Sequence, residues 1–519
     1  MGRNHRLTFF ALLGWLTLIA GCVVLARSIE TNFGAVRVQI VHLQGIQGVE
    51  LVGKLYIPEV ASEQNPRPAV LALHGFQNDK ETQDAYAIEL SRRGFVVLAL
   101  DQYGHGSSGG RLALTDQDAT LGGDAAYQFL KTLPYVDDAN LGVMGHSMGA
   151  GTTLAVAQAN PDHRALNPQC GIAGNTGLNN LLLTQARYDE FLNFRENLPT
   201  VDGLTTHPDR LQAFGLSEVA EWDQTYGSFG SGSARRQTLI NTVHPGVTHS
   251  HKAVAEAITW MNNALNGGRV DDSWIDPNQH IFMWKELCTL LALLFSLASM
   301  IPLTNLLLGR RFFAGLDCRD ETAQAAANAG SDPLAAAQAA RLYRPYAASE
   351  RAWRKYALIN NLIAGLTYPL LIGLGGYLLA SAVPGLSMII ANGVATWYLG
   401  NALIYLLVFT IWYLRNRHKR NVTLYNMGLS FHPQKLVLDG RILSRTVLLA
   451  ALLLGWLYLL VFLAQRLAGI EFRFLWPFMR EFSLQRFGYF WVYLLPVLLF
   501  FLLNGGVFLF GQARLRQRE

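Results

Sequence analysis

The chain has 519 residues, of which 51% are hydrophobic and 15% are charged, and this length allows several domains. The formal net charge of +5 does not indicate nucleic-acid binding, because the Arg and Lys clusters lie between long apolar runs, where they orient membrane segments. Of the four cysteines only Cys170 falls between residues 28 and 280, which excludes a disulfide within that segment.

The first apolar run covers residues 7–26 and is long enough to cross a membrane, which takes about 20 residues. It contains LIAGC, which ends at Cys22 as in a lipoprotein signal that is cleaved and lipidated. The apolar VVLA after Cys22 instead favours an uncleaved anchor over residues 1–27. Both interpretations place the following domain outside the cytoplasm.

Residues 28–270 alternate between strand-like and helix-like segments, which predicts an α/β domain with a doubly wound, mostly parallel sheet. VRVQIVHL and VELVGKLYIP have a two-residue apolar period and predict an antiparallel pair. Further strands are predicted at AVLALHGF, FVVLALD, LGVMGHS, CGIAGN, NLLLTQ and QTLINTV. Helices are predicted at DAYAIELSRRG, residues 118–133, MGAGTTLAVAQAN and AVAEAITWMNNAL. Sheets of this kind carry their sites at the carboxyl ends of the strands.

Ser147 lies in the motif GHSMG, between a predicted buried strand and a predicted helix. A tight strand-to-helix turn forces the serine into a strained backbone conformation and presents its hydroxyl above the sheet. Side chains two positions away would collide with the strand and the helix, so glycine is needed at Gly145 and Gly149. This context favours a catalytic serine over a glycine-rich turn that holds one by chance.

Residues 36–268 resemble the α/β-hydrolase superfamily, and most closely its dienelactone-hydrolase-like and serine-aminopeptidase-like members. The resemblance rests on GHSMG, on HGF at residues 74–76 and on DQYGHGSSGG at residues 101–110. It implies the chain order serine, acid, histidine. It also implies an oxyanion hole formed by the backbone N–H groups of Phe76 and Met148. His74 is expected to be a structural residue that bonds the backbone of its own turn.

A catalytic serine needs a base, and the base should precede the last helix of the domain. NTVHPGVTHSHKAV offers His249, which we predict, with His244 and His251 as alternatives. The acid should follow the strand NLLLTQ, where we predict Asp189, with Glu190 as the alternative. The acid would hold the imidazole tautomer and stabilise the imidazolium.

Residues 190–236 form a predicted insertion between the acid and the base. Such an insertion either covers the site and shapes its pocket or simply packs its aromatic residues under a lid. The aromatic candidates are Phe191, Phe194, Phe214, Trp222, Tyr226 and Phe229. The sequence has no metal-ligand cluster, P-loop or dinucleotide fingerprint, so we expect no cofactor and no metal.

Residues 281–519 form a predicted all-α membrane domain with five further spans. These lie near residues 285–308, 357–382, 388–414, 444–465 and 488–511. Arg and Lys cluster before the first span, between spans two and three, between spans four and five, and after the last. We therefore expect both termini in the cytoplasm and the hydrolase domain on the other side.

Few ionisable groups fall within these spans, which argues against an ion-coupled transporter. Lys285 and Glu286 are expected to reach the interface from a helix end, and FRFLWPFMREF at residues 472–482 could lie flat in it. Loop 321–340 is Ala-rich and reads as a weak helix or a linker.

The sequence thus predicts a membrane-anchored serine hydrolase that cleaves an ester, or a thioester or amide, of a small or lipid-like acyl substrate. A serine peptidase or an acyltransferase with the same triad is the alternative. A non-catalytic hydrolase-fold domain in a membrane assembly is the other. The bilayer is the expected partner, and no nucleic acid is expected.

Overall fold

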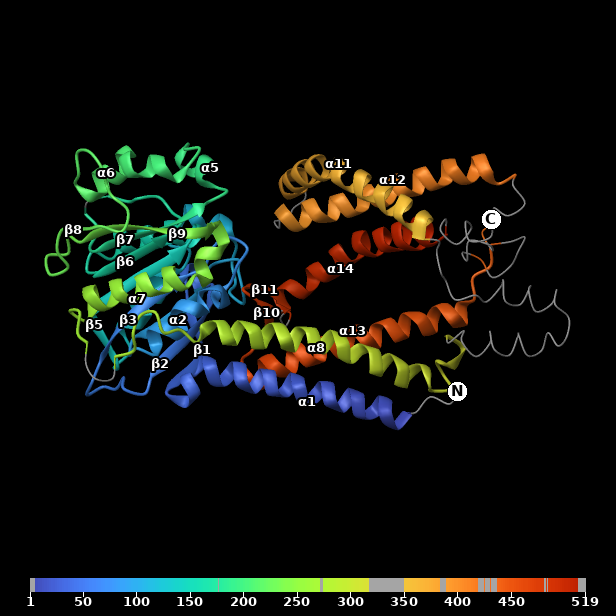
Figure 1. Cartoon of the computed structure of the whole chain (residues 1–519), viewed down its shortest axis with the longest axis horizontal. Coiled ribbons are helices and arrows are strands. Elements are labelled where there is room, and N and C mark those ends of the chain that lie inside the picture. The colour runs from blue at the N-terminus through green and yellow to red at the C-terminus, as the bar shows by residue number, and fades with distance from the viewer. Residues whose placement is uncertain are drawn as a thin grey trace. The chain divides into compact units, whose positions relative to one another are not determined.

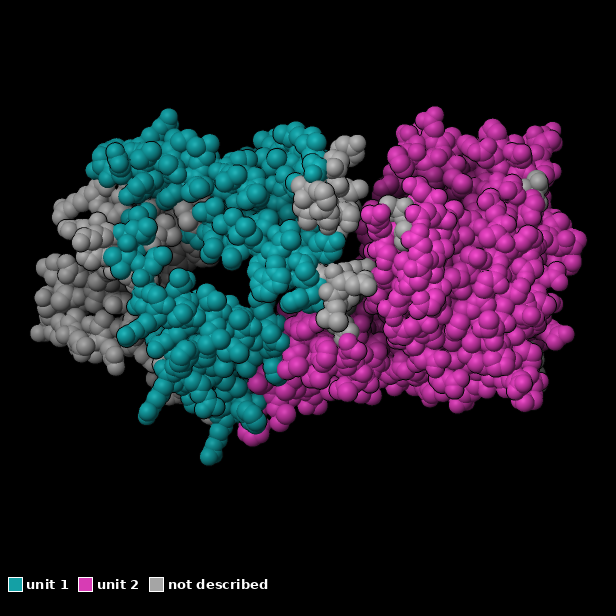
Figure 2. Space-filling model, turned by 180° about the vertical axis from the view of Figure 1, so that it is seen from behind, with its two compact units in different colours: residues 1–9, 301–456, 482–519 teal, residues 10–300, 457–481 magenta. Residues whose placement is uncertain are grey.

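A computed structural model describes residues 5–175, 177–270, 274–316, 350–382, 389–418, 424, 430, 436–479, 482 and 484–511. The chain forms two compact units (Figure 2). One comprises residues 1–9, 301–456 and 482–519, and the other comprises residues 10–300 and 457–481. The second unit therefore contains the hydrolase domain together with parts of three apolar helices. The predicted loop 321–340 lies outside the described residues.

The hydrolase domain is built on a nine-stranded sheet in the order β1-β2-β4-β3-β5-β6-β7-β9-β8 (Figure 1). Its strands are β1 Val36–Gln44, β2 Glu50–Pro58, β3 Arg67–Leu73, β4 Val96–Asp101, β5 Val136–His146, β6 Ala165–Gln169, β7 Leu181–Tyr188, β8 Thr225–Tyr226 and β9 Arg235–Val243. Strands β3 to β7 and β9 are parallel where they pair with one another, and β1, β2 and β8 pair antiparallel. The predicted antiparallel pair and the mostly parallel sheet are confirmed.

Alternate residues of the central strands belong to two separate hydrophobic cores, one on each face of the sheet. Leu71, Leu98 and Leu100 face a core that contains helices α3 Gly123–Lys131 and α4 Met148–Ala159. Val70 and Ala99 face the other core, which contains α2 Asp84–Ser91 and α7 His251–Leu265. Helices thus cover both faces of the sheet, as a doubly wound fold requires.

One strand was predicted at the wrong place. The prediction put a strand at CGIAGN, but the structure has β6 immediately before it, at ALNPQ. Asn167 and Gln169 are polar but fully buried in β6, so the strand does not form an apolar run in the sequence. Cys170 then adopts a positive φ of 50°, which ends the strand.

Among the described residues, six helices are long and apolar enough to cross a membrane, which is the number of spans that the sequence predicts. They are α1 His5–Glu30, α8 Phe282–Leu308, α11 Glu350–Ala382, α12 Ile389–Asn416, α13 Gly440–Ala468 and α14 Leu484–Phe500, which continues as η8 Phe501–Gly511. A short hairpin of β10 Phe472–Phe474 and β11 Trp476–Met479 follows α13. These helices indicate a multi-pass membrane protein, and the side on which each loop lies stays a prediction.

Polar side chains join the helices of the first unit. The Trp397 indole on α12 donates to the Ala364 carbonyl on α11 at 3.1 Å, and the Tyr493 hydroxyl on α14 contacts the Asn392 amide oxygen at 2.7 Å. Such interhelical hydrogen bonds satisfy polar groups that lipid cannot.

Candidate active site

Ser147 occupies the turn between β5 and α4, with φ 58° and ψ −114°. This conformation is strained for a residue with a side chain and marks a functional turn. A Cβ atom on Gly145 would lie 2.3 Å from the Gly149 carbonyl oxygen, and one on Gly149 would lie 2.4 Å from that of Leu73. No larger residue fits at either position, so the steric reason for both glycines is confirmed.

The Ser147 backbone N–H donates to the Gln169 carbonyl at 2.8 Å, which fixes the turn to the end of β6. Within the described part of the chain, its hydroxyl makes no hydrogen bond to protein. The Ser147 hydroxyl is therefore available to contact a substrate.

Asp189 follows β7 directly, and its carboxylate is saturated with donors. Oδ1 contacts His244 Nδ1 at 2.8 Å and accepts from the Phe191 backbone N–H at 3.0 Å. Oδ2 accepts from Gln185 at 2.7 Å and from Arg195 at 2.8 Å. Burial alone would raise the pKa of Asp189, but the hydrogen bonds from His244 and Arg195 outweigh it and hold that pKa well below its usual range.

The structure brings His244, and not His249, to this carboxylate. His244 follows β9 and begins the 3₁₀ segment η6, His244–His249. His249 ends η6, with Nδ1 2.8 Å from the Thr248 hydroxyl and Nε2 3.9 Å from Glu286. The pairing predicted from the sequence therefore changes from Asp189–His249 to Asp189–His244.

The reason for this change lies in the compactness of η6. The prediction chose His249 because it lies in a loop just before the last helix of the domain, after PGVT. A Cβ atom on Gly246 would lie 2.1 Å from the Thr242 hydroxyl, so the chain folds back tightly against β9. The tight turn leaves its first histidine beside the end of β7.

The other two alternatives from the sequence lie elsewhere. His251 begins α7, and its Nδ1 lies 2.8 Å from Nδ1 of His280. Glu190 accepts from the His244 backbone N–H at 2.9 Å, so it holds the histidine by the main chain and not by the ring.

The Asp189–His244 pair borders the serine turn through His146. The rings of His146 and His244 are 4.7 Å apart, and His146 Nε2 donates to the His244 carbonyl at 3.0 Å. Burial and the neighbouring His244 lower the pKa of His146 to about 3, so His146 stays neutral. The edge-to-face contact of Phe191 with His244, at 4.8 Å, fixes the imidazole further.

The two predicted oxyanion donors flank the same turn. A Cβ atom on Gly75 would lie 2.9 Å from His146 Nδ1, so the HGF turn packs directly against the residue before Ser147. Met148 is the first residue of α4, where backbone N–H groups lack helical partners. In the described residues, neither the Phe76 nor the Met148 N–H forms a hydrogen bond.

His74 is a structural residue, as the sequence indicates. Its Nδ1 donates to the Gly75 carbonyl at 2.7 Å, and its Nε2 accepts from the Gln102 N–H at 3.1 Å. Burial and the nearby His105 lower the pKa of His74 to about 4. Both nitrogens hold backbone, so His74 ties the HGF turn to the loop after β4.

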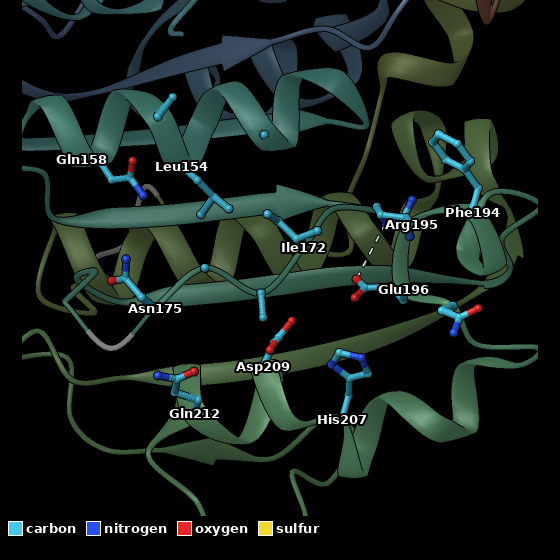
Figure 3. Close-up of a pocket in the computed structure, with 15 residues that line it drawn as sticks. Leu154, Gln158, Ile172, Asn175, Phe194, Arg195, Glu196, His207, Asp209 and Gln212 are labelled. Atoms are coloured by element: carbon cyan, nitrogen blue, oxygen red, sulfur yellow. Dashed lines mark ion pairs between the residues drawn. The ribbon is translucent and has the colours of Figure 1, made fainter.

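A cavity of about 630 Å³ lies beside α4, under the predicted insertion (Figure 3). Leu154 of α4 and Ile172 of the loop after β6 line it, together with Phe194, Arg195 and His207 of the insertion. Arg195 also bonds Asp189, so one side chain contacts both the cavity and the acid, whereas Ser147 and His244 are not among the residues that line the cavity.

The insertion contains α5 Leu192–Glu196, η5 Val201–Thr206 and α6 Pro208–Phe214. Its aromatic residues divide between the two predicted roles. Phe194 lines the cavity, Phe214 is buried in a core with Tyr226 against it, and Phe229 packs on Trp260. Sequence reasoning missed Arg195 and Gln185, because nothing in a local pattern reveals which distant carboxylate a side chain reaches.

Two groups of side chains in the described residues have a composition that could hold a metal ion. The first is His146, Cys170 and His244, but His244 is engaged by Asp189, and burial raises the pKa of the Cys170 thiol, which opposes the thiolate a metal needs. The second, Glu30, Glu81 and Asp84, already holds ammonium groups.

Residues 64–178 match the family described as serine aminopeptidase, S33. Together with the strand order, this match confirms that the chain carries an α/β-hydrolase domain.

Curated proteins that are similar to this chain include the following three. A monoacylglycerol lipase of Mycolicibacterium smegmatis is 32% identical over 28% of this chain and 50% of its own length. The uncharacterized protein YcjY of Escherichia coli is 33% identical over 21% of this chain and 37% of its own length. A serine hydrolase-like protein of Dictyostelium discoideum is 31% identical over 22% of this chain and 30% of its own length. The chain thus spans half or less of the length of each of these three relatives.

Proposed function

We propose that the protein is a membrane-anchored serine esterase that works through an acyl-enzyme on Ser147. The observation that carries this proposal is the hydrogen-bonded pair of Asp189 and His244, beside a strained serine turn. The monoacylglycerol lipase among the relatives supports an ester, and a lipid-like one, as the substrate.

The geometry supports a definite assignment of roles. His244 takes the Ser147 hydroxyl proton as the oxygen attacks the carbonyl carbon, and Asp189 stabilises the imidazolium that forms. The N–H groups of Phe76 and Met148 hold the oxyanion of the tetrahedral intermediate. His244 then gives its proton to the leaving alcohol. Water, activated by the same histidine, hydrolyses the acyl-enzyme and restores Ser147.

The cavity beside α4 would hold the acyl chain or the leaving group. Its mixed lining suits an ester with an apolar chain and a polar head, since Leu154 and Ile172 are apolar whereas Arg195 and His207 are polar. The six apolar helices would keep the enzyme at the membrane, where lipid-like esters are abundant.

We further propose that the hydrolase domain lies on the non-cytoplasmic side of the cytoplasmic membrane, with both termini in the cytoplasm. The support is the distribution of Arg and Lys, since positive loops resist translocation whereas long domains translocate largely regardless of charge.

The test is to label membranes with a fluorophosphonate probe and then to profile ester hydrolysis against acyl-chain length. Labelling at Ser147 with hydrolysis of monoacyl esters is the expected result. Faster cleavage of aminoacyl amides would favour the peptidase, which the family description also suggests. Transfer to added alcohols in preference to water would favour the acyltransferase. No labelling of a folded protein would favour the non-catalytic assembly role.

A further inference from the structure

A buried group of charged side chains joins the hydrolase domain to the apolar helices within the second unit. We name this group the ionic cluster. Its members are Glu30, Lys54, Glu81, Asp84, Lys285, Glu286 and Arg473, and the side chain of each is no more than 5% exposed. They come from α1, β2, the segment Lys80–Gln83, α2, α8 and β10.

Each positive member of the ionic cluster bridges several carboxylates. Lys54 pairs with Glu30 and, at 2.7 Å, with Glu81. Lys285 pairs with Glu30 at 2.7 Å and with Asp84.

The guanidinium of Arg473 closes the cluster between the two parts of the chain. It reaches Asp84 at 3.1 Å and Glu286 at 2.6 Å, and Glu286 also accepts the Leu475 N–H at 2.8 Å. The sequence suggested that Lys285 and Glu286 reach a membrane interface, but both side chains are buried in protein. Arg473 of FRFLWPFMREF is buried in protein as well.

The hydrolase domain needs these partners. A buried charge is stable only when it is paired. Residues 28–270 alone would carry three carboxylates of the ionic cluster, Glu30, Glu81 and Asp84, against the single ammonium of Lys54. Burial alone would raise the pKa of Asp84, but the surrounding cations hold it well below its usual range.

The ionic cluster touches η6, the segment that begins with His244. At the carboxyl end of η6, Nε2 of His249 lies 3.9 Å from Oε1 of Glu286. In the middle of η6, the Tyr86 hydroxyl donates to the Val247 carbonyl at 2.9 Å, and Tyr86 lies on α2 two residues after Asp84. Glu286 thus lies against the carboxyl end of η6 without a hydrogen bond to His249, and α2, which carries Asp84, is hydrogen-bonded to the middle of η6.

We propose that Glu286 and Arg473 are positioning residues for His244, acting through His249 and η6. The proposal rests on the proposed function. The chain after residue 281 then does more than tether the enzyme, because the start of α8 and strand β10 complete the support of the catalytic histidine. Anchoring alone requires one span and no contact with η6.

The experiment uses the full-length chain in lipid nanodiscs, with a short-chain nitrophenyl ester and a fluorophosphonate probe. Glu286→Ala and His249→Asn should each lower kcat by about 10- to 100-fold with KM little changed, because a small displacement of a catalytic group costs this much. Labelling should slow in parallel. Glu286→Asp, which keeps the charge, should recover most of the loss.

The matched control is Arg27→Ala. Arg27 pairs with Glu30 at the partly exposed edge of the ionic cluster and makes no described contact with η6. This variant should keep the wild-type kcat. His249→Asn leaves the Glu286–Arg473 pair intact, so it tests η6 without an unpaired buried charge.

A purely structural role would lower the melting temperature of all variants and leave kcat per folded enzyme unchanged, and this result would overturn the proposal. If labelling does not depend on Ser147, the proposed function fails instead. If labelling depends on Ser147 but not on Glu286 or His249, only the positioning role fails.

Discussion

Asp189 and His244, which are 55 residues apart in the chain, are joined by a contact of 2.8 Å between Oδ1 and Nδ1. The carboxylate thus binds Nδ1 of His244, and the other ring nitrogen, Nε2, stays available to a serine hydroxyl. Arg195 and Gln185 hold the other carboxylate oxygen, so the acid cannot rotate away from the histidine. Five expectations follow from this arrangement and from the elements around it.

Ser147→Ala should give a folded, membrane-inserted protein that no longer reacts with a fluorophosphonate. Its kcat should fall by a factor on the order of 10⁶, as for the loss of a catalytic serine. Gel fluorescence of labelled membranes checks the first expectation, and ester turnover checks the second. Undiminished labelling of the variant would remove Ser147 from the mechanism.

His244→Ala should be as inactive as the serine variant, because the hydroxyl then lacks a base. His251→Ala is the matched control and should keep near-wild-type turnover, since His251 pairs with His280 and not with Asp189. Turnover of a short ester by both purified variants distinguishes them. An active His244→Ala enzyme would return the role of base to one of the other histidines.

Gly151→Phe should shift substrate preference toward short acyl chains. Gly151 lines the cavity, and a Cβ atom there meets no other atom within 4 Å. The added ring would fill space meant for substrate, so kcat/KM for long chains relative to short ones should fall at least about tenfold.

Gly151→Ala is the control for this substitution. It should leave the chain-length profile unchanged and stabilise α4 by about 1 kcal/mol, the difference in helix propensity between the two residues. An unchanged profile in Gly151→Phe would mean that the substrate binds elsewhere.

Acid should destabilise the hydrolase domain between about pH 6.5 and pH 4. In the folded state the pKa of His74 is lowered to about 4 by burial, whereas an unfolded histidine titrates near 6.5. Over this interval the unfolded chain binds the extra proton, so the free energy of unfolding falls as the pH falls. His74 alone should cost about 1 kcal/mol at pH 5.5 relative to neutral pH.

His74→Asn keeps a donor for the Gly75 carbonyl but removes the titration, so its melting temperature should fall less between pH 7.5 and pH 5.5. His42→Asn, at a side chain that is 62% exposed, is the control and should follow the wild type. Equal pH dependence in all three proteins would contradict the assignment.

A periplasmic-type reporter that is active only outside the cytoplasm should be active when fused after about residue 270. The same reporter should be silent after residues 330 and 430, because Arg and Lys cluster in those loops. Protease added to cells with an opened outer barrier and an intact inner membrane should cut the hydrolase domain. A cytoplasmic signal from the residue-270 fusion would reverse the orientation and leave the triad untouched.

The fold could be predicted wherever one local pattern decided it. Apolar runs placed β3, β4 and β5, and the glycines around Ser147 located the turn between strand and helix. The position of Asp189 after β7 followed from the same kind of pattern. Strand β6 was not predicted because it contains buried polar residues. Asn167, for example, donates a hydrogen bond to the Leu182 carbonyl at 3.0 Å.

The histidine partner and the ionic cluster could not be predicted, because both depend on where distant segments meet. The sequence favours His249 over His244, and only the tight turn at Gly246 fixes which one lies beside β7. Likewise, Lys285, Glu286 and Arg473 look like interfacial charges when each is considered alone. The carboxylates of Glu30 and Asp84, brought from other elements, make the burial of Lys285 and Arg473 favourable, and Arg473 in turn pairs with Glu286.

The contact between Asp84 and Arg473 spans 389 positions of the chain, which gives the enzyme an order of assembly. Asp84 leaves the ribosome long before α13 and the hairpin after it are made, and domains form from the N-terminus during synthesis. Until that hairpin arrives, Asp84 lacks its guanidinium partner and η6 lacks the support that reaches it through Glu286. A stalled or truncated chain would therefore leave an immature, weakly active hydrolase at the membrane. Wild-type turnover would be reached only after insertion of the chain is complete.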